Sequence, residues 1–316
     1  MFEITFLLYP ILFLSLLVVI FLIKANNIID VILLNSAFSL FTVVMYLILD
    51  APDVAMTEVA VSVLVSVFAA LAIKSIYKNY YQFEEKFNPI LFLLMMIFAG
   101  IFIYACMDMP EFDKPVINSI YFKNNKEDVG VSSVVTAILA GYRGYDTLLE
   151  TIVILLGGVS ILLVSEQNKL PDPQEKDNLV STMSRLIIPV IVLFALYLQF
   201  HGEVSPGGGF QAGVLCGAAF IIYALSDPNF LNTSFFNKLK NIAVLGAGIY
   251  LVIGAISLVS NLEFLNYNIF SDNKLLAQKL GIILVEIGVG ITVGAVMLLI
   301  YCCLALEGYV FNKYKL

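Results

Sequence analysis

The chain has 316 residues, of which 60% are hydrophobic and 13% are charged, about half the charged fraction of an ordinary soluble domain. A soluble protein could not bury so many apolar side chains and still cover its surface with so few charges. The net charge of −7 comes without any basic cluster. Composition therefore excludes a nucleic-acid-binding protein and a soluble enzyme, and it predicts an all-α protein that crosses a membrane several times.

Nine apolar segments are long enough to be membrane helices, since a spanning helix needs about 20 such residues. They cover residues 2–23, 28–49, 54–76, 89–107, 147–165, 185–200, 210–226, 239–262 and 279–306. Most of the 17 Lys and Arg residues lie in the loops on one side of these helices. The positive-inside rule therefore favours an N-terminus outside and a C-terminus inside. The first segment has no basic start and no small-residue cleavage site, so we expect an anchor helix in the cell inner membrane.

Two polar segments, residues 77–88 and 166–183, divide the predicted helices into groups of three, two and four. The long outer loop at residues 108–146 is too short to form a core of its own. We therefore predict three membrane modules and one linker. Their boundaries are residues 1–80, 87–166, 167–183 for the linker, and 184–316.

The third predicted helix opens with the sequence DAPDVAMTE, residues 50–58. Asp50 can cap the helix, Pro52 suits its first turn, and Asp53 favours the positive end of the helix dipole. Glu58 lies about 7–8 Å further along, where a charge in the bilayer costs ~2.5–3.5 kcal/mol or more. Glu58 is therefore either a satisfied structural carboxylate or, with Asp53, part of a proton or cation pathway.

The fifth predicted helix follows the sequence YRGYD. Arg143 and Asp146 are three residues apart and are able to pair on a helix surface. Thr147 and Glu150 have the spacing of a capping box at a helix start. A carboxylate in an ion pathway is the alternative reading of Glu150.

The segment HGEVSPGGGFQAG, residues 201–213, joins the sixth and seventh helices on the predicted outer side. Its central residues are Pro206, Gly207, Gly208 and Gly209. Three glycines permit backbone shapes that other residues avoid, and they place free N–H groups where an anion or a carboxylate could bind. The segment is either a tight outer hairpin or irregular backbone that lines water within the membrane. His201 is the only histidine, and it is either a structural hydrogen-bonding group or a proton relay.

Glu286 lies inside the ninth predicted helix, and Gly290 and Gly294 follow it at four and eight residues. The acid therefore heads a stripe of small residues that lets another helix approach closely. Glu286 either closes this packing seam at the outer interface or belongs to an ion pathway. One histidine and four scattered cysteines without a CxxC pair cannot build a zinc, haem or iron–sulfur site, so we expect no metal centre and no cofactor.

Three of these segments resemble one family. Residues 50–58 resemble the APDVAxTE motif in the C-terminal tail of the large A-type component of Mrp-type multisubunit Na⁺/H⁺ antiporters. Residues 141–150 are similar to the (F/Y)RG(F/Y)DTxxE motif of the next module of that tail. Residues 201–213 resemble the HGxxxPGGGFxxG motif of the B-type component. The motifs come in family order and cover almost the whole chain apart from the linkers.

The resemblance is to an A-type tail fused to a B-type component, without the large antiporter-like helix bundle that normally precedes the tail. Leu149 and Ala212 stand where glycine is expected, and Glu203 stands where a second histidine is frequent, which argues against a two-histidine relay. The resemblance implies one component of a transporter, not an enzyme, in a complex that exchanges cytoplasmic Na⁺ for external H⁺. Its implied partners are the large antiporter-like subunits, small membrane subunits and the lipid bilayer, with no nucleic acid.

The resemblance thus implies a structural and ion-pathway role, with Glu58, Glu150 and Glu286 as the first carboxylates to test. The same modules occur as small subunits of membrane-bound hydrogenases. The main alternative is therefore a membrane-arm component of an ion-pumping hydrogenase or a related redox complex. A self-contained solute transporter is disfavoured, because the sequence shows no repeat pair and no matched broken helices.

Overall fold

The computed structural model describes residues 2–25, 27–64, 66, 89–107, 125–164, 178–227, 230 and 233–313. Regular structure in these residues is helical, and they contain no β-strand. The structure therefore confirms the all-α fold class. The elements are α1 Phe2–Ile23, α2 Ile28–Ile48, α3 Pro52–Glu58, the π-helical η1 Val59–Leu64, α5 Pro89–Met107, α7 Val134–Thr136, the π-helical η2 Ala137–Tyr142, α8 Gly144–Val164, α9 Asn178–His201, α10 Gly209–Ser226, α11 Thr233–Val259, the 3₁₀ turn η3 Tyr267–Phe270, and α12 Lys274–Lys313.

Seven helices of the described chain are long and apolar enough to cross a membrane, namely α1, α2 and α8 to α12. Residues 92–107 of α5 form a shorter apolar helix. Most of the third predicted span beyond Leu64 lies outside the described residues, as do most of the polar segments that separate the predicted modules. The chain is thus a polytopic membrane protein. Its nine spans, its orientation and its module boundaries stay predictions.

Helix ends differ from the apolar segments in a consistent direction. Helix α9 begins at Asn178, inside the predicted linker, and α12 runs from Lys274 to Lys313. Hydropathy locates the part of a helix that lies in hydrocarbon. Backbone hydrogen bonding continues beyond that part into polar turns at the membrane surface.

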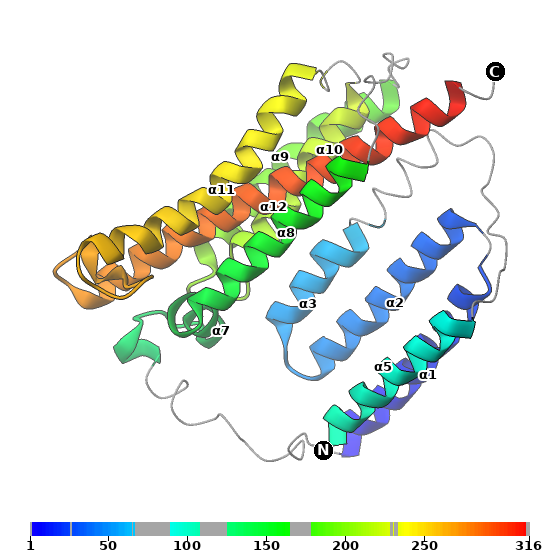
Figure 1. Cartoon of the computed structure of the whole chain (residues 1–316), viewed down its shortest axis with the longest axis horizontal. Coiled ribbons are helices and arrows are strands. Elements are labelled where there is room, and N and C mark those ends of the chain that lie inside the picture. Colours follow the sequence, from blue (N-terminus) through cyan, green and yellow to red (C-terminus); the bar gives the residue numbers. More distant parts are fainter. Residues whose placement is uncertain are drawn as a thin grey trace.

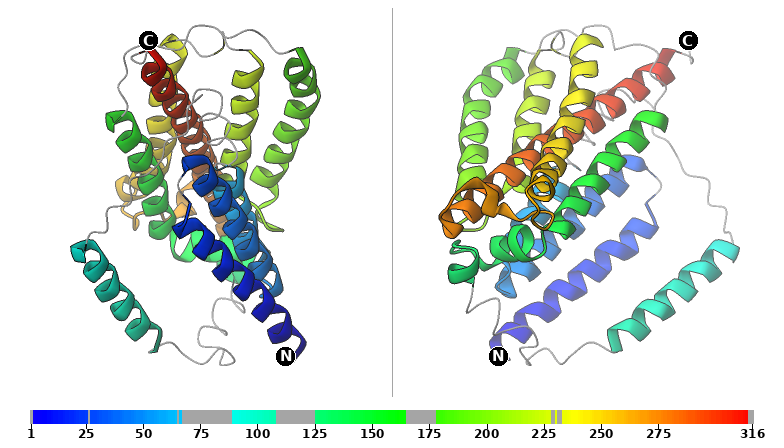
Figure 2. Two further views of the ribbon diagram at one scale, coloured as in Figure 1. Left: turned by 90° about the vertical axis from the view of Figure 1, so that its right-hand side faces the viewer. Right: turned by 60° about the vertical axis from the view of Figure 1, so that its left-hand side comes forward.

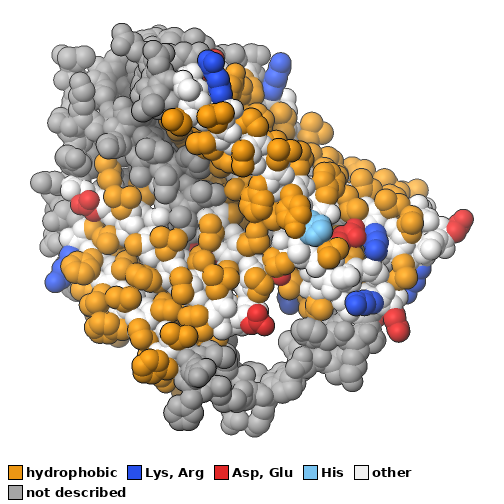
Figure 3. All heavy atoms as spheres, turned by 180° about the vertical axis from the view of Figure 1, so that it is seen from behind, with side chains coloured by type: hydrophobic (Ala, Val, Ile, Leu, Met, Phe, Trp, Pro, Cys, Tyr) orange, Lys and Arg blue, Asp and Glu red, His pale blue; other side chains and the backbone are white. Residues whose placement is uncertain are grey.

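Helix α12 lies at the centre of a bundle and packs against α8, α9, α10 and α11 (Figure 1). The hairpin of α2 and α3 joins the bundle beside α10, and α1 packs on α2. Helix α5 stands apart from the α8–α12 bundle in both views of Figure 2, and every α5 side chain that the structure describes is exposed. Hydrophobic side chains also cover much of the face in Figure 3. These surfaces suit contact with lipid or with other apolar helices.

The second half of the predicted outer loop is part of the bundle core, which the sequence did not predict. Val131 and Ala137 are almost completely buried, and their cluster includes residues of α10, α11 and α12. The hydroxyl of Tyr267 donates to the carbonyl oxygen of Ala140 at 3.0 Å. Burial raises the pKa of this Tyr267 hydroxyl, so it keeps its proton and stays a donor. Residues 125–142 therefore cover one end of the helices without needing a core of their own.

The closest helix contact in the bundle is between α10 and α12. Two stripes of residues spaced by four face each other, namely Gly209, Gly213 and Gly217 on α10, and Glu286, Gly290 and Gly294 on α12. A Cβ atom on Gly213 would lie 2.5 Å from the carbonyl oxygen of Gly290, and one on Gly209 would collide with that of Glu286. The structure thus confirms that Glu286 heads a small-residue stripe against which another helix packs.

We expect Gly213→Val to destabilise the folded chain by ~3 kcal/mol, at the upper end of the usual overpacking cost, because the obstacle is backbone. The measurement is the thermal stability of the purified complex in detergent. Gly248→Val is the matched control, because a Cβ at Gly248 meets nothing within 4 Å. Equal stability of the two variants would contradict the close α10–α12 contact.

Candidate functional site

The chain reverses between α9 and α10 in a tight turn at residues 202–208. Gly208 has φ +137°, a value that favours glycine, and its N–H donates to the carbonyl oxygen of Leu198 at 3.1 Å. The N–H of Gly207 donates to Oδ1 of Asp53 at 3.3 Å. The prediction that these glycines hold a carboxylate is therefore confirmed, and the carboxylate belongs to a helix about 150 residues away in the chain.

The start of α3 presents that carboxylate. Pro52 and Asp53 occupy its first turn as predicted, but the predicted cap is wrong, because Ala51 takes the cap position and no side chain caps the helix. Asp50 has φ +57° and lies in the turn between α2 and α3. Aspartate tolerates this left-handed conformation better than most residues do, so Asp50 serves the turn between the helices and leaves Asp53 to reach the glycines.

A second hydrogen bond joins α3 to α10 one turn deeper. Nε2 of the buried Gln211 donates to Oγ1 of Thr57 at 2.9 Å, and Thr57 donates in turn to the carbonyl oxygen of Asp53 at 2.9 Å. The sequence analysis missed both residues. Their signal was present, because each lies inside a motif and carries a polar side chain within an apolar helix.

A cavity of about 490 Å³ lies where α3, α8, α10 and α12 meet. Carboxylates from three separate helices line it, namely Asp53, Glu150 and Glu286. Its other polar lining comes from Thr57, Thr136, Thr147, Thr151, Gln211 and the glycines of the turn. In the described part of the chain, no group of three or more His, Cys, Asp or Glu side chains is arranged to hold a metal ion. The carboxylates thus share a polar space without jointly enclosing one dehydrated cation.

Glu150 reaches the cavity from a different position than the sequence predicted. Helix α8 begins at Gly144, and the Thr147 hydroxyl donates to the carbonyl oxygen of Leu139 at 2.7 Å. The predicted capping box is therefore wrong, because the helix starts three residues before Thr147. Arg143 and Asp146 form the predicted ion pair at this start, and the exposed Glu150 follows one turn later.

Glu58 and His201 do not line the cavity. Glu58 is half-buried at the last position of α3, and the π-helical η1 begins at the next residue. Such π-helical turns are rare and are frequent at functional sites. His201 ends α9 and stacks on Tyr197, with ring centroids 4.7 Å apart. A pathway role for these two residues stays a prediction.

Two family models match the chain. Residues 179–299 match a domain related to the MnhB subunit of Na⁺/H⁺ antiporters. Residues 13–78 match the model that describes the D component of MBH.

Several curated proteins are similar to the chain. It is 24% identical over 242 residues to a probable K⁺/H⁺ antiporter protein of the combined A/B type from Rhizobium meliloti, which covers 64% of this chain and 24% of that protein. It is 30% identical over 131 residues to the B-type Na⁺/H⁺ antiporter protein from Alkalihalophilus pseudofirmus, which covers 38% of this chain and 91% of that protein. The chain thus spans about a quarter of the A/B relative and almost all of the B-type relative.

Two solved structures share the fold. The Mrp complex from Dietzia sp. DQ12-45-1b matches 95% of this chain and 35% of its own chain, with a TM-score of 0.70 and 18% identity. The archaeal membrane-bound sulfane sulfur reductase matches 69% of this chain and 97% of its own, with a TM-score of 0.50 and 25% identity. The first likeness concerns the fold alone. The extent and identity of the match to the B-type relative, together with the matching family model, show that this chain belongs to the MnhB family of Na⁺/H⁺ antiporter subunits.

Proposed function

We propose that this chain is an integral component of an Mrp-type complex in the cell membrane that exchanges Na⁺ or another monovalent cation for protons. The names of its relatives as antiporter subunits support this proposal. The chain has a structural and ion-pathway role within the complex and is not an enzyme by itself. Its partners are the large antiporter-like subunits and other small membrane subunits, which would cover the exposed faces of helices such as α5.

The observation that carries the proposal is the cavity shared by Asp53, Glu150 and Glu286. Charged groups among membrane helices are costly, and they persist where ions or protons move. A carboxylate there can bind a proton, and a hard cation prefers the same oxygen ligands. The cavity therefore offers alternating occupants a common set of binding groups, which is what an exchanger needs.

A redox-linked complex is the second candidate. The match of residues 13–78 to the D component of MBH and the likeness to the sulfane sulfur reductase favour it. Purifying the complex from its native membrane separates the two candidates. Iron–sulfur subunits in the complex would favour the redox machine, and antiporter subunits alone would favour the exchanger.

We expect Glu286→Gln to reduce ΔpH-driven Na⁺ exchange by about tenfold or more, because the amide cannot bind or release a proton at this position. The assay uses membrane vesicles that hold the whole complex, and assembly is checked by co-purification of the subunits. Glu263→Gln is the matched control, because Glu263 is exposed in the turn before α12. Normal exchange by an assembled Glu286→Gln complex would remove Glu286 from the pathway.

Asp53 has both a charge and a structural hydrogen bond, and two substitutions separate these properties. In Asp53→Asn the side-chain oxygen can still accept from the N–H of Gly207, whereas Asp53→Ala loses the acceptor. We expect both variants to lose exchange and only Asp53→Ala to lower the thermal stability, by about 1 kcal/mol. If Asp53→Asn exchanged normally, Asp53 would have a structural role alone.

Glu58 is tested by the same assay with Glu58→Gln. We expect slower exchange with normal assembly, because the proposed pathway continues from α3 into the membrane part of the helix. A normal rate would mean that Glu58 is a structural carboxylate and that the cavity acids act without it.

A further inference from the structure

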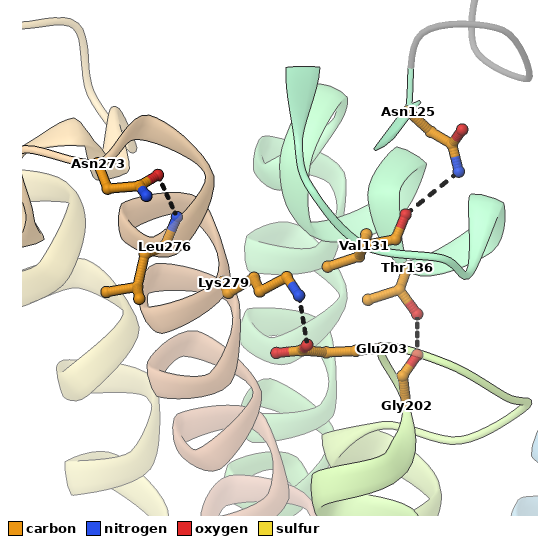
Figure 4. Close-up of polar contacts among 8 residues, drawn as sticks. All are labelled: Asn125, Val131, Thr136, Gly202, Glu203, Asn273, Leu276 and Lys279. Carbon is orange, nitrogen blue, oxygen red and sulfur yellow. Dashed lines mark hydrogen bonds and ion pairs between the residues drawn. The ribbon is translucent and has the colours of Figure 1, made fainter. Parts of the chain in front are cut away.

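The turn between α9 and α10 carries a second acidic group that the cavity does not include. Oε2 of Glu203 lies 3.9 Å from Nζ of Lys279 on α12 (Figure 4). The Glu203 side chain is only 18% exposed, and its other oxygen, Oε1, is buried with no hydrogen-bond donor among the described residues. Leaving a buried carboxylate oxygen without a donor is unfavourable. Structural pairing with Lys279 alone therefore does not account for the placement of Glu203.

Glu203 lies directly behind the wall of the cavity. Thr136 lines the cavity, and its hydroxyl donates to the carbonyl oxygen of Gly202 at 2.6 Å (Figure 4). The N–H groups of Ser132 and Ser133 donate to the carbonyl oxygen of Glu203 at 3.0 and 2.9 Å. The segment that includes Thr136 therefore holds the turn on one side and forms part of the cavity on the other.

Helix α12 connects Lys279 with the cavity acid Glu286. The two residues are seven positions apart, so they lie on the same face about two turns, or ~10 Å, from each other. The turn follows this face, because a Cβ on Gly208 would lie 3.5 Å from Oε1 of Glu286. Going along α12 from its first turns, the chain thus presents the Glu203–Lys279 pair first and Glu286 next.

We propose that Glu203, with Lys279 as its counter-charge, is the carboxylate through which protons pass between the cavity and the side of the membrane that carries the turn. The distribution of Lys and Arg predicts that this side is the outer one. The proposal rests on the proposed exchange function, and it assigns to this site an access route and a positioning residue that the cavity alone does not show.

The proton balance of this route is simple. A proton from water binds the Glu203 carboxylate and neutralises it, which removes its attraction to Lys279. The same proton then passes to the Glu286 carboxylate across the wall near Thr136, and Glu203 becomes negative and pairs with Lys279 again. Lys279 keeps its own proton throughout.

Charge-selective labelling tests the route without depending on transport. The probe site is Glu286→Cys in the whole complex, and the reagents are membrane-impermeant methanethiosulfonates of positive and negative charge, added from the side that carries the turn. Mass spectrometry of the peptide that contains position 286 gives the labelling rates, so the native cysteines remain. We expect the cationic reagent to react faster. This preference should fall several-fold in Glu203→Gln and rise in Lys279→Met.

Glu263→Gln serves again as the control and should leave the preference unchanged. Failure of either reagent to reach position 286 from this side, or a preference that Glu203→Gln does not alter, would overturn the proposal. Exchange by the wild-type complex is a separate result. If it were absent, the proposed antiport function would fall, while the labelling would still decide whether the cavity is reached past Glu203.

Discussion

The backbones of α10 and α12 approach each other so closely that several positions on α10 have no room for a side chain. This contact positions the polar groups of the site. It places the start of α10 against Glu286, and the glycine turn that leads into α10 consequently lies between α12 and α3. Within the membrane such an approach is driven by packing and weak polar contacts, because lipid supplies no hydrophobic force between helices. Small residues at four-residue spacing are what make it possible.

The turn solves an electrostatic problem that the helix contact creates. Bringing α3, α8 and α12 together places three acids around one cavity, where mutual repulsion and desolvation both act against charge. Backbone N–H groups of the turn supply one partner, since Gly207 donates to Asp53. Glu286 and Glu150 have no such donor from the turn among the described residues. An arrangement with one satisfied acid and two loosely held ones suits groups that must bind and release ions.

Local patterns predicted several details of this site correctly and failed in others. The glycine N–H groups, the Glu286 stripe and the Arg143–Asp146 pair follow from the positions of a few residues along one helix or turn, and the structure contains all three. The predicted caps at Asp50 and Thr147 failed, because other turns determine where those helices start. Burial of residues 125–142 was missed, since their apolar partners lie on distant helices. The same limit hid Gln211 and Thr57, whose polarity has meaning only across the α3–α10 contact.

The sequence by itself determined that this chain is an all-α membrane protein, that its motifs belong to an antiporter family, and that few acids lie where charge is costly. Those conclusions depend on composition, on helical spacing and on short motifs, all of which are local along the chain. Which acids share a cavity, and which face the turn instead, was decided only by the tertiary structure. The physical reason is that Asp53, Glu150, Glu203 and Glu286 come from segments far apart in sequence. Their neighbours depend on how closely the helices pack and where the turns reverse the chain.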